Sequence, residues 1–188
     1  MQQIAPNIYK ICSDSNVYFL DFAKKIIIDT AKPMHKKAVE KELKTKIDPK
    51  QIDFVFFTHL HYDHIGNFGL FENAQFFASN TEIQAWKNDP FGAILNMEVV
   101  EAFNAALEAI ETIDCTPFGL QVIPTPGHTI GSVCFWYEKE KILFSGDTLF
   151  EHSHGRVDLP TSVPKEMMRS LLKLKKYEYK TLCAGHDY

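Results

Sequence analysis

The sequence contains no apolar run of the length needed to span a bilayer. Its first residues, Met1 to Asn7, are polar and lack the basic-then-apolar pattern of a secretory signal peptide. Both absences argue against a membrane-embedded or secreted protein, so we expect a cytoplasmic location.

Cysteine is sparse, with four residues in the chain, and no two of them have CxxC spacing. In a chain of this size such cysteines are typically reduced and act as small, mostly buried hydrophobic residues. A disulfide framework and a cysteine-based metal site are therefore disfavoured. The four are Cys12, Cys115, Cys134 and Cys183.

Positive charge is not in excess, because 20 Lys and Arg face 24 Asp and Glu, for a formal net charge of −4. Lysines do gather between residues 36 and 46, but Glu40 and Glu42 alternate with them, as on a solvated helix face. We therefore expect no nucleic-acid partner. The sequence does not indicate an oligomeric state.

Internal linkers, low-complexity segments and repeats are also absent, so residues 1–188 are predicted to form a single domain. Short strands dominate both halves of the chain, and a helix-rich segment separates them. This order predicts two sheets packed face to face with helices outside. Strands are expected at residues 7–12, 16–21, 25–29, 53–57, 75–78, 120–124, 133–137, 142–145 and 181–184. Helices are expected after Pro33 and at residues 80–87, 97–113 and 164–176.

The segment 97–113 has the clearest amphipathic pattern, with Val99, Phe103 and Ile110 on one side and four glutamates away from it. We predict a continuous helix there. If this helix covers one side of the functional site, its acidic face would favour neutral or cationic groups over polyanions.

Histidine is concentrated in one place: His59, His61 and His64 lie within six positions, together with Asp63. Burying these polar groups together is costly without a partner, and a divalent cation supplies one. In an extended segment, residues two apart face the same way, so His59 and His61 can bind one ion. As the chain turns into a helix, Asp63 and His64 reach a neighbouring position. Imidazole and carboxylate ligands both suit zinc or a similar metal.

Three later segments place a metal-competent side chain beside a glycine at the end of a predicted strand. These side chains are His128, Asp147 and His186. Each alone is weak evidence, since a lone His or Asp in such a turn is usually structural. Together with the dense cluster they favour a metal centre.

Residues 58–66, with the pattern THLHYDHIG, resemble the HxHxDH signature of the metallo-β-lactamase superfamily, and the later ligands follow in the expected order. The resemblance covers essentially the whole chain. It implies an α+β fold, the four-layer αββα sandwich, with two divalent metal ions at one edge. Zinc fits best, with iron or manganese as alternatives. By the same resemblance, His59, His61 and His128 hold the first ion, Asp63, His64 and His186 hold the second, and Asp147 bridges them.

Within the superfamily, residues 126–132 (PGHTIGS) are similar to the PGHTPGS motif of glyoxalase II-like hydrolases, with Ile130 in place of the second proline. Residues 155–160 (GRVDLP) are similar to their GRxDLP segment. Class B1 β-lactamases carry Cys where Asp147 stands, and diiron flavoproteins usually carry a carboxylate at the position of His61. Nucleases of the superfamily need inserted domains for which this chain has no room.

The resemblance implies a hydrolase that acts on a small-molecule thioester or ester by means of a metal-bridging hydroxide. Asp63 would be the catalytic residue that orients this nucleophile and accepts its proton. Glyoxalase II enzymes carry a further helical domain after the last ligand, whereas only two residues follow His186 here, which argues against S-lactoylglutathione. Three alternatives stay open: a single-iron persulfide dioxygenase, a lactonase or phosphodiesterase of the same fold, and a non-catalytic metal-stabilised module.

Some polar residues near the motifs have no assigned ligand role. We expect His152 and His154 to be exposed loop residues, and Arg156 to pair with Asp158 rather than to bind a substrate carboxylate. Thr129 and Thr148 are equally consistent with hydrogen bonds to the ligands and with ordinary turns. His35 is expected on the surface.

Overall fold

The computed structural model describes residues 1–187 and contains a seven-stranded and a four-stranded sheet. The first sheet runs in chain order, antiparallel from β1 to β4 and parallel from β4 to β7. Its strands are β1 (Gln2–Ala5), β2 (Ile8–Ile11), β3 (Val17–Asp21), β4 (Lys25–Ile28), β5 (Phe54–Phe56), β6 (Gln75–Ala78) and β7 (Leu107–Ala109).

The second sheet has the order β11-β10-β9-β8, in which β10 and β11 are parallel and the other pairs are antiparallel. The parallel pair needs a crossover, which α6 (Pro164–Leu174) provides. The strands are β8 (Leu120–Pro124), β9 (Val133–Tyr137), β10 (Ile142–Gly146) and β11 (Thr181–Ala184).

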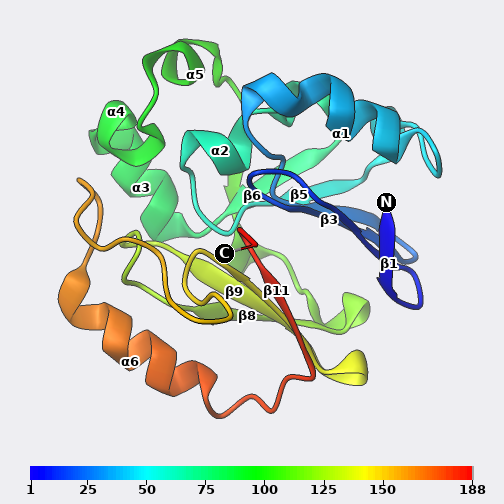
Figure 1. Ribbon diagram of the computed structural model, residues 1–188. Coiled ribbons are helices and arrows are strands. Elements are labelled where there is room, and N and C mark those ends of the chain that lie inside the picture. The colour runs from blue at the N-terminus through cyan, green and yellow to red at the C-terminus, as the bar shows by residue number, and fades with distance from the viewer. Residues whose placement is uncertain (188) are drawn as a thin grey trace.

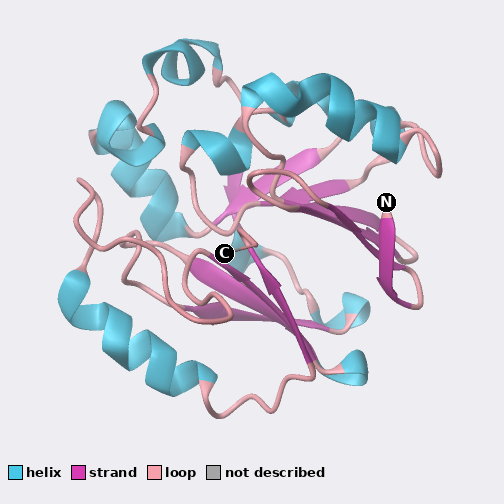
Figure 2. Cartoon of the chain, viewed as in Figure 1, coloured by secondary structure: helices cyan, strands magenta, loops and turns pink. Residues whose placement is uncertain are grey.

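Helices cover the outer faces of the two sheets (Figures 1 and 2), which confirms the predicted αββα sandwich. On the side of the first sheet lie α1 (Lys36–Leu43), α2 (Tyr62–Ile65), α3 (Asn80–Asn88), α4 (Pro90–Ile94) and α5 (Met97–Ala102). On the side of the second sheet lies α6.

The central strands β3 and β4 of the first sheet are buried on both faces. Ile26 and Ile28 of β4 belong to the cluster between the sheets, together with Phe135 and Phe144 of the second sheet. Ile27, pointing the other way, belongs to a separate cluster beneath the helices. This explains why β4 is almost wholly apolar rather than alternating.

The prediction of a continuous helix at residues 97–113 is wrong beyond Ala102. Helix α5 ends at Ala102, and Phe103 already has an extended backbone, with φ −75° and ψ 101°. Leu107–Ala109 form β7 instead, hydrogen-bonded in parallel to β6. Strand β6 offers backbone hydrogen bonds along its free edge, and this long-range pairing overrides the local helical pattern.

Other differences are smaller. Strand β1 was not predicted, because its side chains are largely exposed and carry no apolar alternation. Helix α6 ends at Leu174, two residues before the predicted end. Cys115, Cys134 and Cys183 are buried and unpaired, and Cys12 is exposed. Within residues 1–187, no helix combines the length and the apolar character needed to cross a membrane.

Candidate metal centre

The predicted ligands lie on four segments, each beyond the carboxyl end of a strand. His59 and His61 follow β5, and His61 has an extended backbone as the residue that caps α2. Helix α2 then carries Asp63 and His64 on its first turn. His128 follows β8, Asp147 follows β10 directly, and His186 follows β11. The structure thus brings together all seven predicted residues at one edge of the sandwich.

Three buried histidines form the first group of donor atoms. His59 Nε2 lies 3.1 Å from His61 Nδ1, and His61 Nδ1 lies 2.9 Å from His128 Nε2. Nitrogen ligands of one tetrahedral zinc ion stand about 3.3 Å apart, as follows from the usual Zn–N distance. The spacing of the three nitrogens therefore fits a single ion.

Asp63, His64 and His186 form the second group, with all three donor atoms within 4.8 Å of one another. Asp147 lies between the groups: its Oδ2 is 3.5 Å from His128 Nε2 and 3.4 Å from His186 Nε2. Its other oxygen, Oδ1, is 3.3 Å from His64 Nε2. One carboxylate thus borders both groups, which is the position a bridging ligand needs.

Two of these buried atoms, His64 Nε2 and Asp147 Oδ1, lie 3.3 Å apart but form no hydrogen bond of good geometry with each other or with any other residue of the described chain. Buried polar atoms are nearly always satisfied, so this arrangement is costly unless something else binds there. A divalent cation would satisfy both atoms. The residues present therefore fit the metal ions that the His/Asp cluster implies.

The electrostatics of the first group favour neutral imidazoles. Burial, reinforced by neighbouring histidines, holds the pKa of His59 well below its ordinary value and lowers that of His61 to about 3. A neutral imidazole keeps the lone pair that a metal ligand needs. Burial also lowers the pKa of His128, although Asp147 opposes this.

The carboxylates dominate the second group. Burial acts to lower the pKa of His64, but Asp147 and Asp29 outweigh it and hold the pKa well above its ordinary value. The pKa of His186 rises to about 9 against the same effect of burial, through Asp147 and Asp63. A cation bound here would replace the protons that these imidazoles otherwise attract.

Three of the candidate ligand imidazoles, those of His64, His128 and His186, are oriented through their second nitrogen. His64 Nδ1 donates to Asp29 Oδ2 at 2.9 Å, and His128 Nδ1 donates to the carbonyl oxygen of Arg156 at 2.7 Å. His186 Nδ1 donates to the carbonyl oxygen of Asp14. These bonds fix the ring orientation and leave the Nε2 atoms facing the centre.

Asp29 was not singled out by the sequence analysis, yet its carboxylate also accepts from the backbone N–H and the hydroxyl of Thr58, at 2.9 and 2.8 Å. The sequence feature that could have identified Asp29 is its position as a polar residue directly after the apolar strand β4. Glu82, also missed, is fully buried beside the centre.

Gly185 allows the chain to approach the centre closely, because a Cβ at this position would lie 2.2 Å from Asp147 Oδ1.

A cavity of about 260 Å³ opens onto the centre. His61, Asp63, His128, Asp147 and His186 line it, together with Tyr62, Leu95, Phe150, Ser153, His154, Gly155, Arg156 and Leu159. His152 lines an adjoining groove of about 760 Å³ that shares His186 with this cavity.

The predictions for the remaining polar residues are met to different degrees. His152 and His154 are exposed, as expected, although both border a cavity. Arg156 pairs with Asp158 at 2.9 and 3.0 Å, as expected. The Thr129 hydroxyl bonds Glu82 Oε2 at 2.9 Å and not a ligand.

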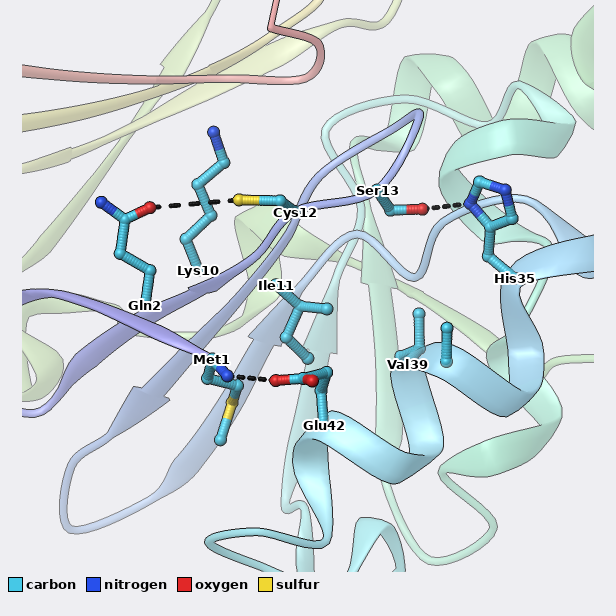
Figure 3. Close-up of a pocket in the computed structure, with 10 residues that line it drawn as sticks. Met1, Gln2, Lys10, Ile11, Cys12, Ser13, His35, Val39 and Glu42 are labelled. Atoms are coloured by element: carbon cyan, nitrogen blue, oxygen red, sulfur yellow. Dashed lines mark hydrogen bonds and ion pairs between the residues drawn. The ribbon is translucent and has the colours of Figure 1, made fainter.

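His35 lies apart from the centre, half-buried in a hollow of about 460 Å³ between the first strands and α1. Figure 3 shows its ring turned toward the Ser13 hydroxyl, near Cys12. The expectation of a surface position is therefore only partly met.

Comparison with known proteins gives the family. Residues 11–186 match the metallo-beta-lactamase superfamily, and the chain belongs to it. A probable metallo-hydrolase of Methanocaldococcus jannaschii is 33% identical over 174 residues, covering 86% of this chain and 80% of that protein. A crystal structure of a protein in a di-iron-bound form has a TM-score of 0.76 and 25% identity, covering 96% of this chain and 92% of that one.

The hydroxyacylglutathione hydrolase of Bartonella quintana is 33% identical over 135 residues, which are 71% of this chain and 48% of that enzyme. The match thus spans about half the length of this relative. The resemblance to glyoxalase II-like proteins is confirmed.

Proposed function

We propose that this chain is a hydrolase of small-molecule thioesters or esters that binds two divalent metal ions through the seven side chains of the centre. The observation that carries the proposal is the placement of Asp147 between two complete groups of donor atoms. Metal ions bound there would polarise a carbonyl group and lower the pKa of water.

The chain's own residues support this chemistry in separate ways. Neutral His59, His61 and His128 present lone pairs from a buried position. Asp63 is partly open to the cavity, and its pKa lies below the ordinary value although burial opposes this, because His186 and His64 stabilise its charge. An ionised Asp63 can accept a hydrogen bond from an attacking water, and thus orient it, before taking its proton.

Similarity to known proteins and the residues of the cavity support the proposed substrate class. Hydroxyacylglutathione hydrolases cleave a thioester, and the shared region of the two chains includes the ligand segments at residues 59–64 and 128. Leu95, Phe150 and Leu159 are among the residues that line the cavity, and their apolar side chains suit an apolar acyl portion. Zinc is the best match to the imidazole and carboxylate set, with iron as the alternative.

A turnover assay tests the proposal. The metal-replete chain is assayed on thioesters, simple esters, lactones, phosphodiesters and β-lactams, beside His59→Ala and the control His35→Ala. We expect thioester or ester hydrolysis by the wild type and by His35→Ala, and its loss in His59→Ala. Absence of thioester and ester hydrolysis, with oxygen consumed on a persulfide by a chain holding one iron, would overturn the proposal in favour of a dioxygenase.

A further inference from the structure

Glu82 is a fully buried carboxylate on the first turn of α3, and its side chain points into the protein. Its Oε1 accepts the backbone N–H of Leu60 at 3.1 Å. Its Oε2 accepts the Thr129 hydroxyl at 2.9 Å and the backbone N–H of Gly131 at 3.0 Å. A buried charge is retained at low cost only when it is satisfied in this way.

These three donors belong to two loops from different sheets. Leu60 lies between His59 and His61, in the loop that leaves the first sheet after β5. Thr129 and Gly131 lie in the loop of the second sheet that carries His128. Glu82 thus connects the backbone segments that hold all three nitrogens of the first donor group.

Neighbouring residues support the contact between Glu82 and the loop that carries His128. The Ser79 hydroxyl caps α3 at the N–H of Glu82 and donates to the carbonyl oxygen of Gly131 at 2.6 Å. A Cβ on Gly131 would lie 2.3 Å from the Glu82 backbone nitrogen, so only glycine permits this approach. In Figure 1 the lower end of α3 reaches the boundary between the two sheets.

We propose that Glu82 is a positioning residue that sets the separation of His59, His61 and His128 and thereby the affinity of their metal site. This inference rests on the proposed metal centre. Glu82 has no hydrogen bond to Asp63, His64 or His186 among the contacts of the described chain, so its effect is expected at one metal site and not at the other.

The test is metal affinity, measured by competition with a chromophoric chelator on the full chain loaded with Co²⁺ or Zn²⁺. Glu82→Gln keeps the shape but places an amide NH₂ either against the Leu60 N–H or against the Thr129 hydroxyl and the Gly131 N–H, so one loop loses its connection. We expect the His59, His61, His128 site to weaken by about 10- to 100-fold, as for other residues that orient ligands. The visible Co²⁺ spectrum of that site should change as well.

Two variants that each remove one ligand allow the affinity of each metal site to be measured separately. In His186→Ala, single-ion binding reports the site that contains His128, and Glu82→Gln should weaken it. In His61→Ala, binding reports the site that contains His186, and Glu82→Gln should change its affinity less than threefold. The matched control is Glu98→Gln, which removes the same charge from the first turn of α5, where Glu98 is exposed.

Thr129→Val provides a milder variant that removes one of the three hydrogen bonds, and it should weaken the same site by a smaller factor. Wild-type affinity at both sites in folded Glu82→Gln and Thr129→Val overturns the inference, as does equal weakening of both sites. A wild type that binds both ions yet hydrolyses no thioester or ester overturns only the proposed function. A wild type that binds no divalent ion overturns both.

Discussion

Buried histidines in this centre are oriented by the nitrogen that points away from it. Asp29, the Arg156 carbonyl and the Asp14 carbonyl each accept from one ligand ring. A ring held in this way presents its other nitrogen without losing further conformational freedom when an ion binds. The affinity of the centre for a metal ion is therefore expected to depend on residues that never contact the metal.

Asp29→Asn tests this dependence directly. The carboxylate accepts three hydrogen bonds, from His64 and twice from Thr58, and an amide cannot accept all three. We expect zinc affinity to fall by about 10- to 100-fold in a chelator competition assay. Asp114→Asn, at an exposed turn, is the control. Equal affinities of the two variants would contradict the assignment.

The low pKa of His61 predicts how the stability of the metal-free chain depends on pH. Its pKa in the fold is about 3, against an ordinary 6.5, because of burial and its histidine neighbours. Below pH 6.5 the unfolded chain gains a proton on His61 that the folded chain does not bind. His61 therefore contributes a loss of stability as pH falls from 6.5 toward 3. The free energy of unfolding of His61→Asn, measured by denaturant titration, should fall less steeply over this window. Parallel slopes for both chains would refute the claim.

Sequence patterns predict which seven side chains come together, because the HxHxDH cluster is local and the other three candidate ligands stand beside glycines at strand ends. Asp29 and Glu82 escape prediction for a physical reason. A polar residue after a strand, or on the first turn of a helix, is usually solvated or capping, and only the tertiary fold turns these two inward.

At the scale of elements, the strands of both sheets are predictable where apolar runs end at glycine or a polar turn, as at β8 to β11. The pattern of residues 97–113 misleads because its apolar side chains satisfy helical spacing while Leu107–Ala109 pair with β6. Edge pairing depends on a partner distant in sequence, which no local pattern encodes.

Helix α6 offers an internal comparison of burial. Leu174 is 1% exposed and packs in the cluster with Ile123, Trp136 and Leu143, whereas Leu172 on the same helix is 53% exposed. We expect Leu174→Ala to lower the free energy of unfolding by about 2–5 kcal/mol. Leu172→Ala should change it by less than about 0.5 kcal/mol in the same chemical denaturation. Similar losses in both variants would show that α6 does not pack as described.

At the scale of the whole molecule, the sandwich brings together ligands from two sheets that share no strand. The first sheet supplies the candidate ligands His59, His61, Asp63 and His64 after β5, and the second supplies His128, Asp147 and His186. Metal binding should therefore hold the two layers together as well as prepare the site for chemistry.

This coupling predicts that zinc stabilises the fold by mass action. A ligand at about 100 times its dissociation constant adds about 2.7 kcal/mol of stability when it binds only the folded state. We expect the melting temperature to rise with added zinc and to fall with a chelator, and the response to be much smaller in His59→Ala. A melting temperature that is insensitive to zinc in the wild type would contradict the coupling.

The central claim is that seven side chains from four segments hold a pair of divalent ions. Elemental analysis of the purified chain, saturated with zinc and then freed of unbound metal, tests it most directly. We expect close to two equivalents per chain for the wild type and about one for His186→Ala. One equivalent or none in the saturated wild type would contradict it.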